Sequence, residues 1–329
     1  YFRRWAPARD TAGDITVRMR ASGALFGRRE GVGPPFNLMR QDGGFSGAGM
    51  VFIVTPDPQQ PFRVAMRWDL SAMGEGARGV WSLGEGAVDT VGPADIVVHA
   101  YYMAGPDVRS FPARNESVGD DLFGVYWMGD TTFDMVEIGD WIVEAYAAMS
   151  SFFNTPDRTF RVFLRRNPAA RSGGGGAGLV QSFMAGYGEL QDVSVPGMRG
   201  LLAHEMVHNW TASLPGPVGA ASWSGEGMAE HYEPHLTFRA GLLTVDEFID
   251  NANSRARNYY LNALNTLPAA DIAGLFWRDA RARTLPYQRG SLYLAGVDAA
   301  MRAKSGGARS LDDLTLAMLA RRDRGESYD

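Results

Sequence analysis

The order in which strand-like and helix-like patterns follow one another is the strongest constraint on the fold of this chain. Up to about residue 103, apolar and polar residues alternate with period two, as in 13–19 and 62–68. Glycine- and proline-rich segments, such as 31–35 and 43–49, separate these runs. Such a pattern is typical of short strands joined by turns. We therefore expect an antiparallel β domain at residues 1–103.

A helical pattern begins near residue 132. We expect Thr132 to cap a helix that runs towards Phe153, because apolar residues recur there at helical spacing. Strands are expected at 160–164 and 179–184, on either side of a glycine turn. From Pro196 onward helices dominate, at about 197–210, 225–240, 244–264, 285–304 and 310–322. The fold class is therefore expected to be α+β, with a second domain at residues 104–329 made of a small sheet and a helical half.

Composition excludes several classes of function. The formal net charge of −5 leaves no basic footprint, so no nucleic-acid partner is expected. No run of about 18 apolar residues is present, so no membrane span is expected. The chain has no cysteine, so any metal ion must be held by histidine and carboxylate. The start at Tyr1 rather than Met, together with the missing cysteines, favours an exported protein slightly over a cytoplasmic one.

The segment 204–208, which reads His-Glu-Met-Val-His, contains the candidate metal ligands and the candidate general base. In a helix, residues i and i+4 lie on one face, so His204 and His208 can both point at one metal ion. Glu205 is rotated by about 100° from His204, so its carboxylate can reach a water molecule held by the ion. Zinc lowers the pKa of such a water towards about 7, and a carboxylate can then take its proton. The segment therefore predicts a zinc hydrolase helix.

The third metal ligand has to be a carboxylate. A catalytic zinc ion usually has three protein ligands and one open position. No further histidine follows at the spacing of an extended metzincin motif. Glu226 and Glu230 both qualify, since they lie one turn apart on one face of the next expected helix. Glu230 could equally orient a histidine through its other ring nitrogen. His231 and His235 are expected to be ordinary helix histidines.

The segment 204–210, followed by Trp-Ser-Gly-Glu-Gly at 223–227, resembles the gluzincins, peptidases whose zinc is held by two histidines and a distal glutamate. The later segments 239–248, 286–290 and 306–313 resemble the glycyl aminopeptidase family, which is related to the aminopeptidase N and leukotriene A4 hydrolase group. These similarities cover roughly residues 160–325.

The resemblance implies a thermolysin-like catalytic domain at residues 104–329. It also implies one zinc ion per chain, held by His204, His208 and Glu226.

The resemblance also implies roles for residues outside the zinc ligands. Tyr287, in a Tyr-x-Arg-Gly setting, would hydrogen-bond the tetrahedral oxyanion, and a phenol facing the metal can indeed donate to developing negative charge. The glycine-rich segment would lead into an edge strand that pairs with the substrate backbone, where glycine permits close approach. The residues expected to contact substrate are Gly174, Gly175, Gly176, Ala177, Glu230 and Arg289.

The chain departs from the family pattern at the glycine segment and after its last helix. Family members commonly place a glutamate just after the glycines to hold the free amino terminus of the substrate, whereas residues 177–180 contain no acid. Aminopeptidase and endopeptidase action therefore both stay open, and Glu189 or Glu230 could replace the missing acid. The family also tends to carry a PDZ module, and no such segment is present before Asp329.

Taken together, these patterns predict a zinc-dependent peptide hydrolase with Glu205 as the general base and Tyr287 as the oxyanion donor. The expected partner is a peptide or protein substrate. Three alternatives remain: a catalytically inactive, zinc-containing peptide-binding module, a zinc hydrolase of a non-peptide substrate, and a structural protein whose fold does not depend on the metal. Intact Glu205 argues against the inactive module, because a site without catalysis has no use for the base.

Overall fold

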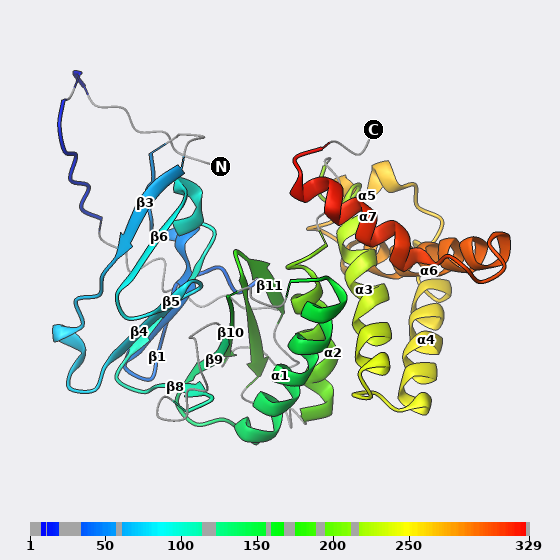
Figure 1. Ribbon diagram of the computed structural model, residues 1–329, viewed down its shortest axis with the longest axis horizontal. Coiled ribbons are helices and arrows are strands. Elements are labelled where there is room, and N and C mark those ends of the chain that lie inside the picture. Colours follow the sequence, from blue (N-terminus) through cyan, green and yellow to red (C-terminus); the bar gives the residue numbers. More distant parts are fainter. Residues whose placement is uncertain are drawn as a thin grey trace.

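A computed structural model describes most of the chain as two five-stranded β-sheets, a two-stranded β-sheet and a group of helices (Figure 1). The described residues are 8–10, 12–19, 34–56, 61–113, 123–155, 159–167, 175–188, 195–211 and 217–326. Seen along the chain, the strands of the first sheet are blue to cyan, those of the second are green, and the later helices run from yellow to red. The fold class is therefore α+β, as the sequence predicted.

The first sheet is antiparallel throughout and has the strand order β1-β2-β7-β4-β5. Its strands are β1 (Met39–Gln41), β2 (Gly44–Ala48), β4 (Arg78–Trp81), β5 (Gly84–Glu85) and β7 (Tyr101–Gly105). A separate antiparallel pair is formed by β3 (Pro61–Met66) and β6 (Val88–Pro93). Short 3-10 helices lie at Gly49–Val51, Ser71–Met73 and Ala94–Val97. The antiparallel character of this first part confirms the expectation from sequence.

The second sheet is mixed, with the order β11-β12-β10-β9-β8. Its strands are β8 (Val108–Phe111), β9 (Phe123–Met128), β10 (Phe160–Asn167), β11 (Gly176–Leu179) and β12 (Ser182–Gly188). The central strand β10 pairs in parallel with both β9 and β12, whereas the outer strands pair antiparallel. A parallel pair needs a long crossover, and helix α1 (Met135–Phe152) provides it between β9 and β10. Strand β11 is left at the edge of the sheet.

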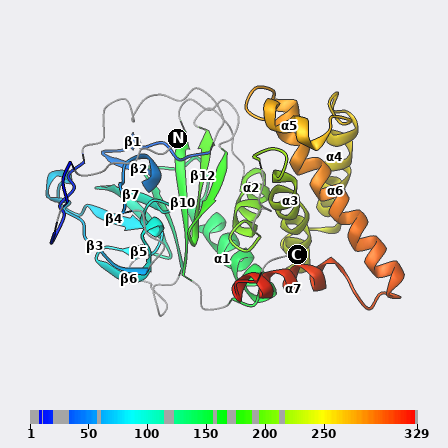
Figure 2. The same cartoon turned by 90° about the horizontal axis from the view of Figure 1, so that it is seen from above.

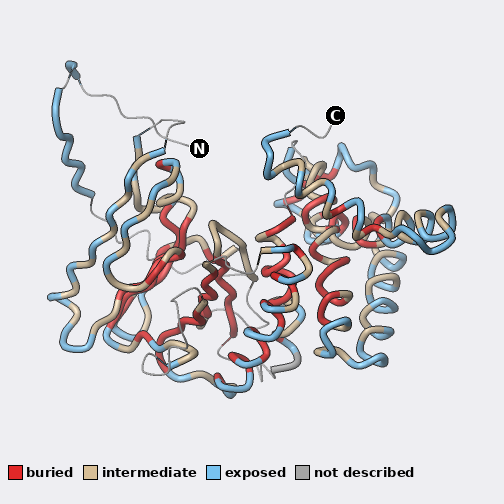
Figure 3. Tube along the Cα trace, in the orientation of Figure 1, coloured by how far each residue is buried: buried red, intermediate tan, exposed pale blue. Residues whose placement is uncertain are grey.

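The helical half packs beside this second sheet, as the view from above shows (Figure 2). Its helices are α2 (Val195–Val207), α3 (Ser222–Arg239), α4 (Val245–Tyr260), α5 (Ala269–Leu275), α6 (Ala280–Lys304) and α7 (Leu311–Asp323). Aromatic side chains from different elements form the centre of the main core, where Tyr146 of α1 stacks on Phe160 of β10 and on Trp210. Buried residues run through both sheets and along α2 and α3 (Figure 3). No helix in the described ranges is both long and apolar enough to cross a membrane.

Several local predictions were wrong. Residues 13–19 form no strand, because Ile15, Val17 and Met19 are exposed and pair with no sheet. Helix α1 is capped by Asp134, whose carboxylate accepts from the N–H groups of residues 136 and 137, and not by Thr132.

The strand expected at 179–184 is divided by a turn at Val180 and Gln181, so it becomes a hairpin of β11 and β12. Helix α5 was not predicted. The domain division after residue 103 falls within β7, and the division itself remains a prediction.

Candidate metal centre

Helices α2 and α3 bring three ligand-type side chains to one point. His204 lies in the last turn of α2, His208 comes directly after its end, and Glu226 lies on the first turns of α3. One ligand atom from each residue lies within 4.8 Å of the other two. The two Nε2 atoms are 3.0 Å apart, and Oε2 of Glu226 is 3.3 Å from His204 and 3.1 Å from His208. The i, i+4 spacing therefore places both imidazoles on one face, as the sequence predicted.

The donor set fits a tetrahedral zinc ion. Two donors bound at about 2.0–2.1 Å to one tetrahedral ion lie about 3.3 Å apart, close to the observed separations. Two ring nitrogens and a carboxylate oxygen can lie this close together when a proton or a metal ion lies between them. Although burial disfavours a charged imidazole, the carboxylates of Glu226 and Glu230 raise the pKa of His204 well above its usual value. The site therefore favours a cation at this point.

Glu205 lies beside this group and is buried. Burial raises its pKa, although the neighbouring imidazoles of His208 and His204 act in the opposite direction. Its side chain packs directly against strand β11. A Cβ added at Gly176 would lie 2.4 Å from both Cγ and Oε1 of Glu205, and one at Gly178 would lie 3.3 Å from Cβ of His208. Glycine at 176 is therefore what allows the edge strand to reach the carboxylate.

Tyr287 of α6 reaches the same point from another helix. Its ring stacks on the imidazole of His204, with centroids 5.8 Å apart and an interplanar angle of 18°. Helix α6 can come this close because it crosses α3 at a point where Gly290 lies against Gly227. A Cβ at Gly227 would lie 2.6 Å from Cα of Gly290. Burial raises the pKa of Tyr287, and the charges of Glu226 and Glu205 raise it further. The phenol therefore keeps its proton and can donate it in a hydrogen bond.

Glu230 lies one turn beyond Glu226 and faces a different atom of the site. Its Oε1 is 3.2 Å from Nδ1 of His204, close enough for an ion pair, although the geometry is not that of an aligned hydrogen bond. Its Oε2 is 3.0 Å from Nε of Arg255 on α4. Both oxygens of Glu230 are thus engaged by protein groups, whereas Glu226 points at the two Nε2 atoms. The structure separates the two carboxylates that the sequence left as competitors.

Of the other predicted substrate contacts, Gly176 and Ala177 lie on β11, Gly175 comes directly before it, and Arg289 lies on α6. Gly174 and Glu189 lie outside the described residues. The carbonyl of Gly175 accepts from the N–H of Gly186, and the carbonyl of Ala177 accepts from the hydroxyl of Tyr101, at 3.0 and 3.1 Å.

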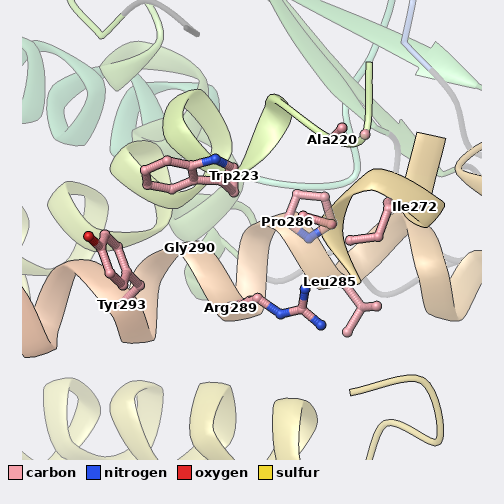
Figure 4. Close-up of a pocket in the computed structure, with 10 residues that line it drawn as sticks. Ala220, Trp223, Ile272, Leu285, Pro286, Arg289, Gly290 and Tyr293 are labelled. Carbon is pink, nitrogen blue, oxygen red and sulfur yellow. The ribbon is translucent and has the colours of Figure 1, made fainter. Parts of the chain in front are cut away.

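Arg289 donates to the backbone carbonyls of Asn265 and Leu267 at 2.9 and 2.8 Å. It also lines a cavity of about 230 Å³ between the start of α3, α5 and α6 (Figure 4). The walls of this cavity are mainly apolar and include Trp223, Ile272 and Leu285. Whether these residues contact substrate remains a prediction.

His231 and His235 lie outside the three-residue ligand group. Their rings stack on each other with centroids 4.2 Å apart, and Nδ1 of His235 lies 2.5 Å from the carbonyl oxygen of His231. Burial lowers the pKa of His231 to about 3, so this imidazole is neutral at pH 7. Their arrangement is that of two ordinary helix histidines, His231 buried and His235 partly buried.

Two residues at the site were not found from the sequence. Tyr101 comes from the first sheet and is fully buried, and Arg255 comes from α4. Neither belongs to a motif, and both reach the site only through contacts between elements far apart in the chain. The sequence shows only that a tyrosine is present in the predicted β domain. It does not indicate which group accepts the hydrogen bond of its hydroxyl.

Comparison with solved structures shows where this fold occurs. The aminopeptidase N family protein from Idiomarina loihiensis superposes with a TM-score of 0.66 at 13% identity, over 86% of this chain and 54% of that one. The chain therefore shares that protein's fold and spans about half its length.

Yeast LTA4 hydrolase gives a TM-score of 0.42 at 12% identity, over 74% of this chain and 39% of that one. The M1 zinc metallopeptidase from Deinococcus radiodurans gives 0.37 at 16% identity, over 80% and 58%. At these scores neither superposition establishes a shared fold. No family model and no curated protein matches the chain.

Proposed function

We propose that the chain is a zinc-dependent peptide hydrolase of the gluzincin type, with a thermolysin-like catalytic domain after its N-terminal β domain. The observation that carries the proposal is the convergence of two imidazoles and a carboxylate beside a buried glutamate and a tyrosine. His204, His208 and Glu226 would hold one zinc ion. When bound, zinc supplies Lewis-acid chemistry, lowering the pKa of a water molecule and polarising the scissile carbonyl.

Glu205 would act as the general base. Its carboxylate would take a proton from the attacking water and pass it to the leaving amine. Burial raises the pKa of Glu205, which makes its carboxylate a stronger base towards the attacking water. Contact with Gly176 would fix the side chain between the water and the substrate strand.

Tyr287 would stabilise the oxyanion that forms on the carbonyl oxygen. Its hydroxyl keeps its proton beside Glu226 and can donate in a hydrogen bond, and stacking on His204 holds the ring beside the ligand group. Removing one oxyanion donor typically costs about 10²–10³ in kcat. Strand β11 would hold the peptide in extended form, since it is the edge of its sheet and an edge strand has unpaired backbone groups.

Aminopeptidase action requires an acidic side chain that binds the free amino group of the substrate, whereas endopeptidase action does not. Of the candidate acids, Glu230 has both oxygens engaged, by His204 and by Arg255. These contacts favour a role for Glu230 in orienting His204 over a role in holding an ammonium group. Cleavage rates on matched peptides with free and acetylated amino termini measure the difference directly.

The substitution Glu205→Gln tests the proposal most simply. It keeps the size of the side chain and removes the base, so we expect one zinc ion per chain to remain while peptide cleavage falls by more than about 100-fold. Full activity with zinc retained would show that Glu205 is not the base. If the unmodified protein binds zinc but cleaves no peptide in a mixed pool, the inactive peptide-binding module or a non-peptide substrate replaces the proposal.

A further inference from the structure

Helix α3 carries three carboxylates along one face. Glu226, Glu230 and Glu233 lie at i, i+4 and i+7, and side chains at these spacings lie on one side of a helix. All three are largely shielded from water, and the side chain of Glu233 is 6% exposed. Like charges at such spacing repel, and buried charges are costly unless they are paired. A cation bound by Glu226 leaves the other two to be compensated by protein groups.

Arg255 compensates both of these carboxylates. It lies on α4, which packs against α3, and its Nε is 3.0 Å from Oε2 of Glu230. A second guanidinium nitrogen donates to Oε2 of Glu233. The planar guanidinium offers donors in a fixed fork, so one side chain can hold two carboxylates in a set relation to each other. The orientation of Glu230 is therefore determined on one side by α4.

The other oxygen of Glu230 faces the ligand group. Its Oε1 lies 3.2 Å from Nδ1 of His204, and Nε2 of the same ring lies 3.0 Å from Nε2 of His208. A carboxylate at Nδ1 favours the tautomer that carries its proton there, which leaves the lone pair of Nε2 free for a metal ion. A continuous series of contacts thus leads from α4 through Glu230 to a metal ligand.

We infer that Arg255 is a positioning residue of the metal centre, which holds Glu230 so that His204 presents Nε2 to zinc. The inference rests on the proposed zinc site, but it does not depend on what the enzyme cleaves. Loss of the partner that contacts a metal-ligating histidine typically lowers metal affinity by about 10–100-fold, and loss of Arg255 releases that partner, Glu230. We therefore expect Arg255→Met to weaken zinc binding by about that factor, measured by competition with a chromophoric chelator.

A double-mutant cycle distinguishes this role from general support of the fold. If Arg255 acts through Glu230, then Arg255→Met should change zinc affinity by less than about threefold when Glu230→Gln is already present. Arg257→Met is the matched control, since Arg257 is an exposed arginine on the same helix, and it should leave zinc affinity unchanged. Arg255→Lys keeps the charge but loses the fork, so its loss should be smaller than that of Arg255→Met.

Two results would overturn the inference: zinc affinity of Arg255→Met equal to that of the unmodified protein, or an equal loss with and without Glu230. If Arg255→Met does not fold, the same cycle with Arg255→Lys replaces it, and additivity there is equally decisive. The proposed function fails in a different way. It fails when the unmodified protein binds no zinc, or binds it without cleaving peptides, and in the second case the cycle still reports on Arg255.

Discussion

Gly176→Ala is expected to damage catalysis without removing the metal. The added Cβ would lie 2.4 Å from Cγ and Oε1 of Glu205, whereas ordinary contact begins at 3.4 Å, so strand and carboxylate must separate by about 1 Å. Glu205 is buried, so its side chain cannot move freely into water. Forced overpacking of this kind costs about 1–3 kcal/mol of stability. A misplacement of about 1 Å of a catalytic group can cost about 10²-fold in rate.

The assay is steady-state peptide cleavage with zinc content measured on the same sample. We expect kcat to fall by about 100-fold, with one zinc ion per chain retained, because an added Cβ at Gly176 would meet Glu205 rather than a metal ligand. Gly296→Ala is the control. Gly296 is exposed on α6, a Cβ there meets nothing within 4 Å, and the change should add about 0.5–1 kcal/mol of stability without altering kcat. Unchanged kcat and KM in Gly176→Ala would show that the contact between β11 and Glu205 does not matter for catalysis.

Three further predictions concern single side chains. Tyr287→Phe should keep zinc and lower kcat by about 10²–10³-fold; an unchanged kcat would remove Tyr287 from the mechanism. Tyr101→Phe deletes the hydrogen bond to the carbonyl of Ala177, worth about 1 kcal/mol, so KM for a peptide should rise about fivefold if β11 holds substrate, and an unchanged KM would contradict that role. Burial lowers the pKa of His231 in the folded protein to about 3, whereas its value in the unfolded chain is about 6.5. Between these pH values only the unfolded chain binds the proton, so the folded protein loses stability as the pH drops from 6.5 towards 3. The free energy of unfolding, measured with urea at pH 7.5 and pH 5, should therefore fall by about 2 kcal/mol less in His231→Gln than in the unmodified protein. An equal fall in both proteins would contradict the lowered pKa of His231.

The local part of the site was predictable from the sequence, because helix geometry fixes it. His204 and His208 need only the 3.6-residue repeat to point at one ion, and the structure places their ring nitrogens together. Glu226 could not be separated from Glu230 by spacing, since both lie on one face of α3. The packing of α3 against α2 separates them, and the resemblance to gluzincins had indicated the same choice.

Contacts between distant elements could not be predicted. Arg255 meets Glu230 only because α4 packs against α3, and Tyr101 meets Ala177 only because the first sheet contacts β11. Alternation also misled at residues 13–19, because a period of two describes a strand only when another strand pairs with it. Patterns of hydrophobicity therefore predicted most elements, while the contacts that complete the site depend on tertiary packing.

The proposed peptide hydrolase activity depends on one zinc ion, held by His204, His208 and Glu226. The most direct test strips the metal with a chelator, adds zinc back in steps, and follows cleavage of a mixed peptide pool. We predict that cleavage disappears on stripping and returns in proportion to added zinc, up to one ion per chain. Full cleavage by the stripped protein, or none at one zinc ion per chain, would contradict the claim.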